Sequence, residues 1–160
     1  MTTIKFIKLT ASIAICLTAG FVGSIFTTPA IDSWYATINK PSFNPPNWIF
    51  APVWTTLFIL MGISLYLIMQ QSSAGKNIKK SLYLFFGQLL LNIIWSVIFF
   101  GFKNPALALI EIIILLAVII LTTKEFKKIN PLASWLFWPY ICWVGFALIL
   151  NFSIWFLNKS

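Results

Sequence analysis

Long uncharged stretches alternate with short polar ones along this chain of 160 residues. Four stretches contain no charge: residues 9–31, 41–75, 81–102 and 129–158. A fifth stretch, residues 106–123, is broken only by Glu111. An α-helix needs about 20 apolar residues to cross the hydrocarbon core of a bilayer. The pattern therefore predicts an all-α integral membrane protein, a bundle of five transmembrane helices near residues 6–28, 47–70, 81–102, 105–123 and 132–157. Because these helices use nearly the whole chain, we expect a single domain over residues 1–160.

Proline and asparagine mark where several of these helices begin or bend. Asn104-Pro105 and Asn130-Pro131 each place a capping residue before a proline at the first helical position. Pro52 and Pro139 lie inside or near the start of the second and fifth helices. A proline there kinks a helix or frees a backbone carbonyl, so we expect one of these effects in both helices.

The first apolar stretch has two interpretations. Lys5 and Lys8 before an apolar run are also typical of a signal peptide, but this run exceeds the roughly 7–15 residues of a signal-peptide core. Small residues recur every four positions in it, which suits close helix packing in lipid. They are Ser12, Cys16, Gly20 and Ser24. We therefore expect a retained first helix.

The connection between the first two helices, residues 29–46, is aromatic and rich in proline. Together with the start of the second helix it reads WYATINKPSFNPPNWIFAPVW over residues 34–54. Proline fixes φ and reduces the number of conformations that a loop can adopt. We expect residues 29–46 to form a stiff lid over a pocket at the membrane surface.

Charge changes the picture in one respect, which is orientation. Hydrophobic residues make up 60 % of the chain and charged ones only 9 %, with a formal net charge of +8. The lysines lie between apolar spans, so we interpret them as topology signals and expect no nucleic-acid partner. Eight of the 11 lysines fall at the N-terminus and in the second and fourth connections. The positive-inside rule then predicts a cytoplasmic N-terminus, with the C-terminus and the lid outside.

The absence of histidine limits the chemistry. His-based catalytic triads, His-ligated haem and most zinc sites are excluded. Cys16 and Cys142 fall inside the predicted first and fifth helices, where a thiol behaves as a small hydrophobic group. We expect no disulfide, no metal site and no required cofactor.

The eight tryptophans divide by their predicted depth in the membrane. Five lie near helix ends, where an aromatic belt explains them: Trp34, Trp48, Trp135, Trp138 and Trp155. Trp54, Trp95 and Trp143 lie roughly 8–18 Å inside their helices at about 1.5 Å per residue. An indole at that depth needs a partner for its N–H. Ordinary core packing and a ligand pocket both explain these three, and we favour the pocket.

Polar residues share a helix face with one of these tryptophans. Gln88, Asn92 and Trp95 are spaced i, i+4, i+7, and Ser96 lies beside them. Carboxamides in a membrane span are costly unless they face the bundle interior or a cavity. They can hold helices together by hydrogen bonds, line a pocket, or do both.

The fifth helix repeats this arrangement, with Trp143, Ala147 and Asn151 spaced i, i+4, i+8. Ala147 leaves room beside an indole, which a ligand or another helix can fill. Glu111 is the one acid inside a predicted span. It can reach toward the interface, pair with Lys103 or a dimer partner, or act in function.

Many short motifs follow in order from the first connection to the last turns of the fifth helix. They are Trp34-Tyr35, Lys40-Pro41, Pro45-Pro46-x-Trp48-x-Phe50, Val53-Trp54, Met61-Gly62, Gln88-Leu-Leu-Leu-Asn92-x-x-Trp95, Phe99-Phe100, Pro139-Tyr140-x-x-Trp143, Phe146-Ala147 and Leu150-Asn151. In this order and spacing they resemble the TspO/MBR family of tryptophan-rich sensory proteins, which is similar to the mitochondrial translocator protein. The resemblance implies five transmembrane helices, a homodimer in a bacterial cell membrane, and a pocket beneath the first loop. That pocket would bind porphyrins (tetrapyrroles) and isoquinoline carboxamide drugs.

The resemblance also implies site residues by motif position. The pocket would be lined by Tyr35, Trp54, Asn92, Trp95, Trp143, Ala147 and Leu150, with further contacts from Pro45, Trp48, Ile49, Gln88, Ser96 and Phe146. In some bacterial relatives two pocket tryptophans support light-dependent breakdown of porphyrin. Trp54 and Trp143 match them and would be the catalytic residues. The tail LILNFSIWFLNKS lacks the tyrosine of the eukaryotic cholesterol motif, so we expect no sterol recognition by that motif.

Three functions follow as hypotheses. The first is a membrane receptor that binds porphyrin between aromatic side chains. The second is an enzyme in which indole acts on photo-excited porphyrin as substrate. The third is a transporter of tetrapyrroles or other small hydrophobic molecules, although the chain has no inverted repeat and no series of ionisable residues typical of an ion-coupled carrier.

Overall fold

The computed structural model describes residues 2–72 and 75–159, and the Ser73-Ala74 part of the connection after the second span lies outside the described residues. Its elements are α1 (Thr2–Ile31), α2 (Trp34–Thr37), α3 (Asn47–Ser72), α4 (Lys79–Ser96), the π-helix η1 (Val97–Gly101), α5 (Pro105–Ile129), α6 (Pro131–Trp135) and α7 (Trp138–Leu157). Five segments are long and apolar enough to cross a membrane: Thr3–Ile31, Asn47–Ser72, Lys79–Gly101, Pro105–Ile129 and Pro131–Leu157. The prediction of an all-α bundle with five membrane helices is confirmed.

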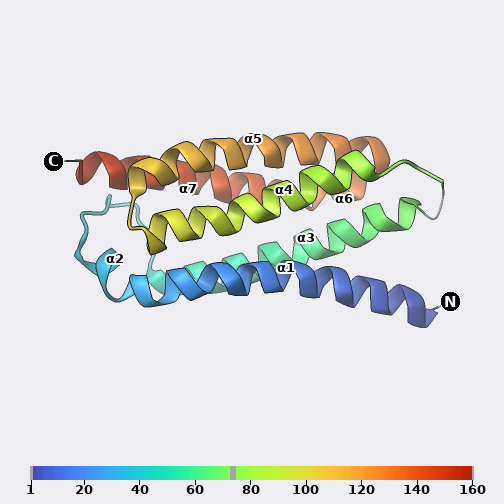
Figure 1. Cartoon of the computed structure of the whole chain (residues 1–160), viewed down its shortest axis with the longest axis horizontal. Helices are drawn as coiled ribbons and strands as arrows, with labels where there is room; N and C mark the ends of the chain where they lie inside the picture. Colours follow the sequence, from blue (N-terminus) through green and yellow to red (C-terminus); the bar gives the residue numbers. More distant parts are fainter. Residues whose placement is uncertain (1, 73–74, 160) are drawn as a thin grey trace.

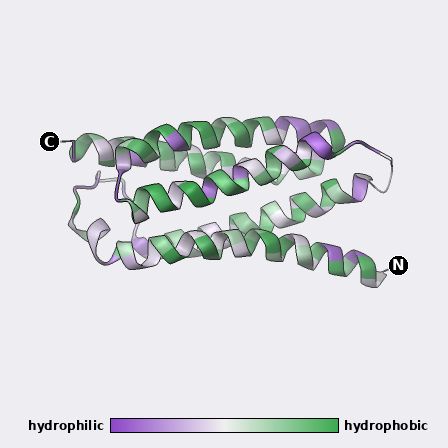
Figure 2. Ribbon diagram, in the orientation of Figure 1, coloured by the Kyte–Doolittle hydropathy of each residue, from purple (hydrophilic) through white to green (hydrophobic). Residues whose placement is uncertain are grey.

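The long helices lie side by side along one axis, with the two termini at opposite ends of the bundle (Figure 1). α1 packs on α3 and α4, while α5 packs on α4 and α7. The short α2 and the rest of the lid, residues 29–46, cover the end at which the chain finishes. Hydrophobic residues extend along the helices, and hydrophilic residues gather where α4 begins and α5 ends (Figure 2). The bundle therefore has a lid end and a lysine-rich end.

Asparagine caps fix the starts of α5 and α6. The Asn104 side chain accepts a hydrogen bond from Leu107 N at 3.0 Å. Asn130 does the same for Leu132 N at 3.0 Å and Ala133 N at 3.4 Å. Each cap precedes a proline in the first turn. The N–H groups of a first turn have no partner inside the helix; here the asparagine accepts from some of them, and the proline has no N–H at all.

Two helices are longer than the uncharged stretches that predicted them. α1 begins at Thr2 and ends at Ile31, and α5 continues to Ile129 rather than stopping near residue 123. In α5, charge ends the apolar span but not the helix, because lysine is a good helix former and is favourable near a helix C-terminus. Lys127 and Lys128 lie in that last turn of α5.

The predicted fifth helix, 132–157, is in fact two helices with a break at Leu136-Phe137. Pro139 lies in the first turn of α7 and has no N–H to continue the α-helical ladder from α6. Ser64 Oγ on α3 donates to Ala133 O on α6 at 2.7 Å and ties the short helix to the bundle. Pro52, by contrast, lies inside an unbroken α3.

A π-helical turn, which no sequence pattern predicted, follows α4. Phe102 N donates to Val97 O at 2.8 Å, a bond five residues back along the chain. The wider turn changes the helical register, and both Phe99 and Phe100 come to line the same cavity. A left-handed Lys103, with φ of 52°, then ends the segment.

Candidate functional site

A cavity of about 390 Å³ lies inside the bundle toward the lid end. Its size is within the range of about 300–1,000 Å³ common for small-molecule sites. The walls come from α1, α2, α3, α4, η1 and α7, so segments from most of the chain meet around it. The lining residues are Leu17, Gly20, Phe21, Gly23, Ser24, Thr27, Thr28, Ile31, Tyr35, Asn47, Phe50, Ala51, Trp54, Thr55, Phe58, Asn92, Trp95, Ser96, Phe99, Phe100, Trp143, Ala147, Leu150, Asn151 and Ile154.

Eight of the predicted site residues meet at this cavity. They are Tyr35, Trp54, Asn92, Trp95, Ser96, Trp143, Ala147 and Leu150. All three tryptophans predicted to be deep are among them, whereas none of the five assigned to the membrane interface lines the cavity. The division of the tryptophans by depth therefore separates those that line the cavity from those that do not.

The other five predicted contacts lie outside the lining. Trp48 is 73 % exposed in the first turn of α3. Gln88 is fully buried, with its Nε2 3.8 Å from Met61 Sδ. Phe146 packs its ring on Trp143 and on Phe43 of the lid, at centroid distances of 5.6 and 6.3 Å. Pro45 and Ile49, at the junction of the lid and α3, do not reach the cavity wall either. A role of these five in ligand binding stays a prediction.

One face of α1 forms a wall that the sequence did not assign to the site. Gly20 and Gly23 explain how α1 comes so close, since a Cβ on Gly20 would lie 2.5 Å from the Phe58 ring. A Cβ on Gly23 would lie 3.1 Å from Ser96 Oγ. The stripe of small residues in the first helix was the available signal, because Gly20 and Ser24 belong to it and both line the cavity.

Hydrogen bonds fix the Trp95 indole. Its Nε1 donates to Asn151 Oδ1 at 3.2 Å, and Asn151 Nδ2 donates to Pro105 O at 2.8 Å. The Trp95 ring also stacks on Phe99, with centroids 5.0 Å apart and planes 21° apart. The partner expected for a deep indole is therefore a side chain of α7, which is itself held by the start of α5.

Trp54 and Trp143 are held by rings instead. Trp54 stacks on Phe58 at 5.7 Å, and Trp143 lies edge-on to Phe50 at 6.0 Å. Within residues 2–72 and 75–159 neither indole N–H has a hydrogen-bond acceptor of the protein. Both side chains line the cavity.

Asn92 supplies a polar group at the wall. Its Nδ2 donates to the hydroxyl of Tyr140, which is buried, at 3.0 Å. The bond joins α4 to α7 and orients the carboxamide. The two roles considered for this residue, helix contact and cavity wall, are both present in the structure.

Local bonds hold the lid in shape. The Tyr35 hydroxyl donates to Asn44 Oδ1 at 2.6 Å, and Lys40 Nζ donates to Tyr35 O at 2.6 Å. Burial raises the pKa of Tyr35 to about 12, although the bond to Asn44 acts to lower it. At the far end, Asn158 accepts from Asn39 N at 3.0 Å and donates to Asn39 O at 2.9 Å. The lid is thus fastened both to itself and to the end of α7.

Glu111 lies on the buried face of α5 and outside the cavity lining. It is 7 % exposed, and its two carboxyl oxygens have no hydrogen-bond partner among the described residues. In the same part of the chain, no three His, Cys, Asp or Glu side chains gather closely enough to hold a metal ion. The polar groups of the cavity are therefore amides, hydroxyls and indoles rather than an acid–base set.

Comparison with known sequences decides the family. The model of the TspO/MBR family matches residues 12–156, which include every residue that lines the cavity. The chain belongs to the TspO/MBR family. The resemblance found in the motifs is confirmed, and the chain is an integral membrane protein of the TspO type.

Relatives from three groups of organisms match nearly the whole chain. The tryptophan-rich protein TspO of Chlorobaculum tepidum is 42 % identical over 154 residues, which cover 96 % of this chain and 98 % of the relative. The protein of the same name from Archaeoglobus fulgidus is 44 % identical over 152 residues, covering 95 % and 97 %. The human translocator protein is 38 % identical over 138 residues, covering 84 % and 80 %. The TspO/MBR match therefore includes the lid and all five membrane helices.

Proposed function

We propose that this TspO-type protein is a membrane receptor for porphyrins and for other flat aromatic ligands of the isoquinoline carboxamide kind. The observation that carries the proposal is that Trp54, Trp95 and Trp143 all face one cavity of about 390 Å³ beneath the lid. Membership of the TspO/MBR family supports it. Porphyrin is a ligand or substrate in this proposal and not a resident cofactor.

The aromatic walls suit a flat ligand because each indole is backed by another ring. Trp95 stacks on Phe99, Trp54 stacks on Phe58, and Trp143 is tilted against Phe146 at 39°. Side chains fixed before binding lose little conformational entropy when a ligand arrives. Each stacked aromatic contact contributes about 0.5–1.5 kcal/mol beyond the area that it buries.

A few polar groups can orient such a ligand. The indole N–H groups of Trp54 and Trp143 and the Asn92 carboxamide lie among mainly apolar lining residues. This combination of an apolar wall and a small number of polar groups is common in ligand sites. The site would discriminate mainly by shape, with the N–H groups directed at polar edges of the ligand.

Porphyrin binding can be measured by titrating the purified protein and following the porphyrin absorption band. We expect Trp143→Phe to raise the dissociation constant about two- to twelvefold, the equivalent of one hydrogen bond, because phenylalanine keeps a ring but lacks the indole N–H. Ala147→Leu should weaken binding more than Trp143→Phe does, because the larger leucine side chain would fill the space beside Trp143. Trp135→Phe is the matched control, since Trp135 is exposed and lies outside the cavity. Unchanged binding in both cavity variants would overturn the proposal.

A second candidate function is favoured by the position of Trp54 and Trp143 on the same cavity. A porphyrin bound there would contact both indoles. An indole can donate an electron to a photo-excited porphyrin, which gives an indole radical cation and a porphyrin radical anion. The anion passes the electron to dioxygen, and dioxygen is the oxidant that opens the macrocycle. We infer that light-dependent degradation of porphyrin is an activity of this site. Under illumination in air, wild-type protein should bleach bound porphyrin faster than a Trp54→Phe/Trp143→Phe variant. Equal bleaching by both proteins would exclude the enzyme and leave the receptor intact.

The setting of the receptor is part of the proposal. We propose a homodimer in a bacterial cell membrane, with the lysine-rich end in the cytoplasm and the lid outside. The family resemblance supports the dimer, and the gathering of lysines at the end where the chain begins supports the orientation (Figure 2).

A further inference from the structure

A second concave surface lies at the lysine-rich end, far from the lid. It is a groove of about 610 Å³ between the first turns of α4 and the last turns of α5. We call it the lysine groove. Its lining residues are Lys80, Leu84, Leu121, Lys124, Glu125, Lys127 and Lys128.

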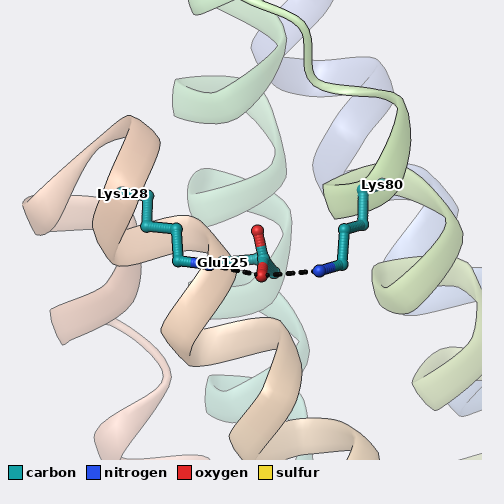
Figure 3. Close-up of polar contacts among 3 residues, drawn as sticks. All are labelled: Lys80, Glu125 and Lys128. Atoms are coloured by element: carbon teal, nitrogen blue, oxygen red, sulfur yellow. Dashed lines mark hydrogen bonds and ion pairs between the residues drawn. The ribbon is translucent and has the colours of Figure 1, made fainter.

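An ion-pair cluster lies at the centre of the lysine groove (Figure 3). Glu125 Oε1 accepts from Lys80 Nζ at 2.9 Å and from Lys128 Nζ at 2.7 Å. Because both ammonium groups bond the same oxygen, they lie no further apart than the sum of these two distances. The lysine side chains are 73 % and 67 % exposed, whereas that of Glu125 is 17 % exposed. Glu125 thus holds two ammonium groups together, and each still has N–H groups facing outward.

The lysine groove carries more positive than negative charge. Four lysines face one glutamate, which leaves three positive charges unbalanced. Lys124 and Lys127 form no ion pair with any residue in the described ranges. Lysines clustered beside a membrane helix attract anionic headgroups, at about 1 kcal/mol per lysine near the surface.

The apolar part of the groove lies nearer the middle of the membrane helices than the lysines do. Leu84 follows Lys80 by one turn of α4, and Leu121 precedes Glu125 by one turn of α5. A turn of helix is about 5.4 Å, so on both walls the charged layer is followed by a leucine layer toward the middle of the membrane helices. A phospholipid presents its groups in the same order, first the charged headgroup and then the acyl chain.

We propose that the lysine groove binds one anionic phospholipid. The headgroup phosphate lies between the ammonium groups of Lys80, Lys124, Lys127 and Lys128, and an acyl chain runs over Leu84 and Leu121. The combination of charge and apolar surface favours a lipid over a free phosphate ion, which has nothing to place on the leucines. The site is separate from the aromatic cavity and does not depend on porphyrin binding.

The test uses full-length protein in detergent micelles, with bound lipid counted by native mass spectrometry. Phosphatidylglycerol and phosphatidylcholine with identical acyl chains are added in parallel, and inorganic phosphate is added as a competitor in a third arm. The variant Lys124→Gln/Lys127→Gln removes two charges from the groove. The variant Lys5→Gln/Lys8→Gln removes two charges from α1 and serves as the matched control, because neither lysine lines the groove.

We expect wild-type protein to prefer phosphatidylglycerol and the groove variant to lose about fivefold in affinity for each lysine removed. The α1 control should keep wild-type affinity, and inorganic phosphate should not displace the lipid. Equal losses in both variants would show a diffuse surface effect and overturn the site. The absence of a preference for phosphatidylglycerol, or displacement by inorganic phosphate at the concentration of the lipid, would also overturn it.

Discussion

The Asn151 side chain shows how much of the site one residue can settle. It accepts from Trp95 and donates to the carbonyl of Pro105, so one carboxamide joins α7, α4 and α5. Sequence spacing predicted that Asn151 shares a face with Trp143 and that Trp95 needs a partner. It could not predict that the two requirements meet, because the pairing depends on the relative height of two parallel helices, α4 and α7.

Tyr35 provides a prediction at the same scale. Burial raises its pKa to about 12, while an unfolded tyrosine loses its proton near pH 10. Since burial makes the folded state hold the proton more tightly, the folded protein should keep its full stability below about pH 10 and lose stability as the pH rises toward 12. Tyrosinate absorbance can be titrated in the wild-type and Tyr35→Phe proteins. The wild-type curve should contain one transition that the variant lacks, and this transition should be centred near pH 12. A missing transition centred near pH 10 would contradict the buried, hydrogen-bonded phenol.

Among the elements, the membrane helices were predictable and their internal irregularities were not. Uncharged runs define where a chain can be in lipid, but a helix continues past them when the next residues are lysines, as at the end of α5. The break before α7 had a signal in Pro139. The π-turn at Val97–Gly101 had none.

The packing of α1 on α3 yields a prediction about glycine. A Cβ on Gly62 would lie 2.5 Å from Ile13 Cα, an atom of the backbone that cannot rotate away. Gly62→Ala should therefore force the two helices apart and cost about 1–3 kcal/mol, roughly 2–12 °C in the unfolding temperature of the purified protein. Gly87→Ala is the control, since no atom lies within 4 Å of a Cβ there. That substitution should leave the unfolding temperature unchanged or raise it slightly, and equal losses in both variants would refute the close contact.

The whole molecule has two different ends, and the sequence predicted both. Aromatic residues and prolines of the lid lie at one end, and lysines lie at the other, where Figure 2 shows hydrophilic residues. Seven of the eight predicted residues that line the cavity fall in family motifs, and the eighth, Ser96, was predicted from its place beside Asn92 and Trp95 on one helix. The α1 wall was not, because glycine and serine in a membrane helix are equally typical of plain helix packing.

Orientation in the membrane is the prediction that belongs to this scale. In a background carrying Cys16→Ala and Cys142→Ala, Ser42→Cys in the lid and Asn77→Cys before α4 place single thiols at opposite, exposed ends. A membrane-impermeant maleimide should label Ser42→Cys in intact cells and Asn77→Cys only after the membrane is opened. The reverse order of labelling would place the lysine-rich end outside.

The bonds between Asn158 and the backbone of Asn39 should affect how long a ligand stays bound rather than how tightly it binds. α7 carries Trp143, Ala147 and Leu150 along the cavity. It ends at Leu157, and the next residue, Asn158, holds the lid. We expect a molecule that leaves through the lid end to open this contact first, although Asn158 does not line the cavity. The tryptophans would then set how strongly a ligand is held, and an asparagine that does not line its site would set how long it stays.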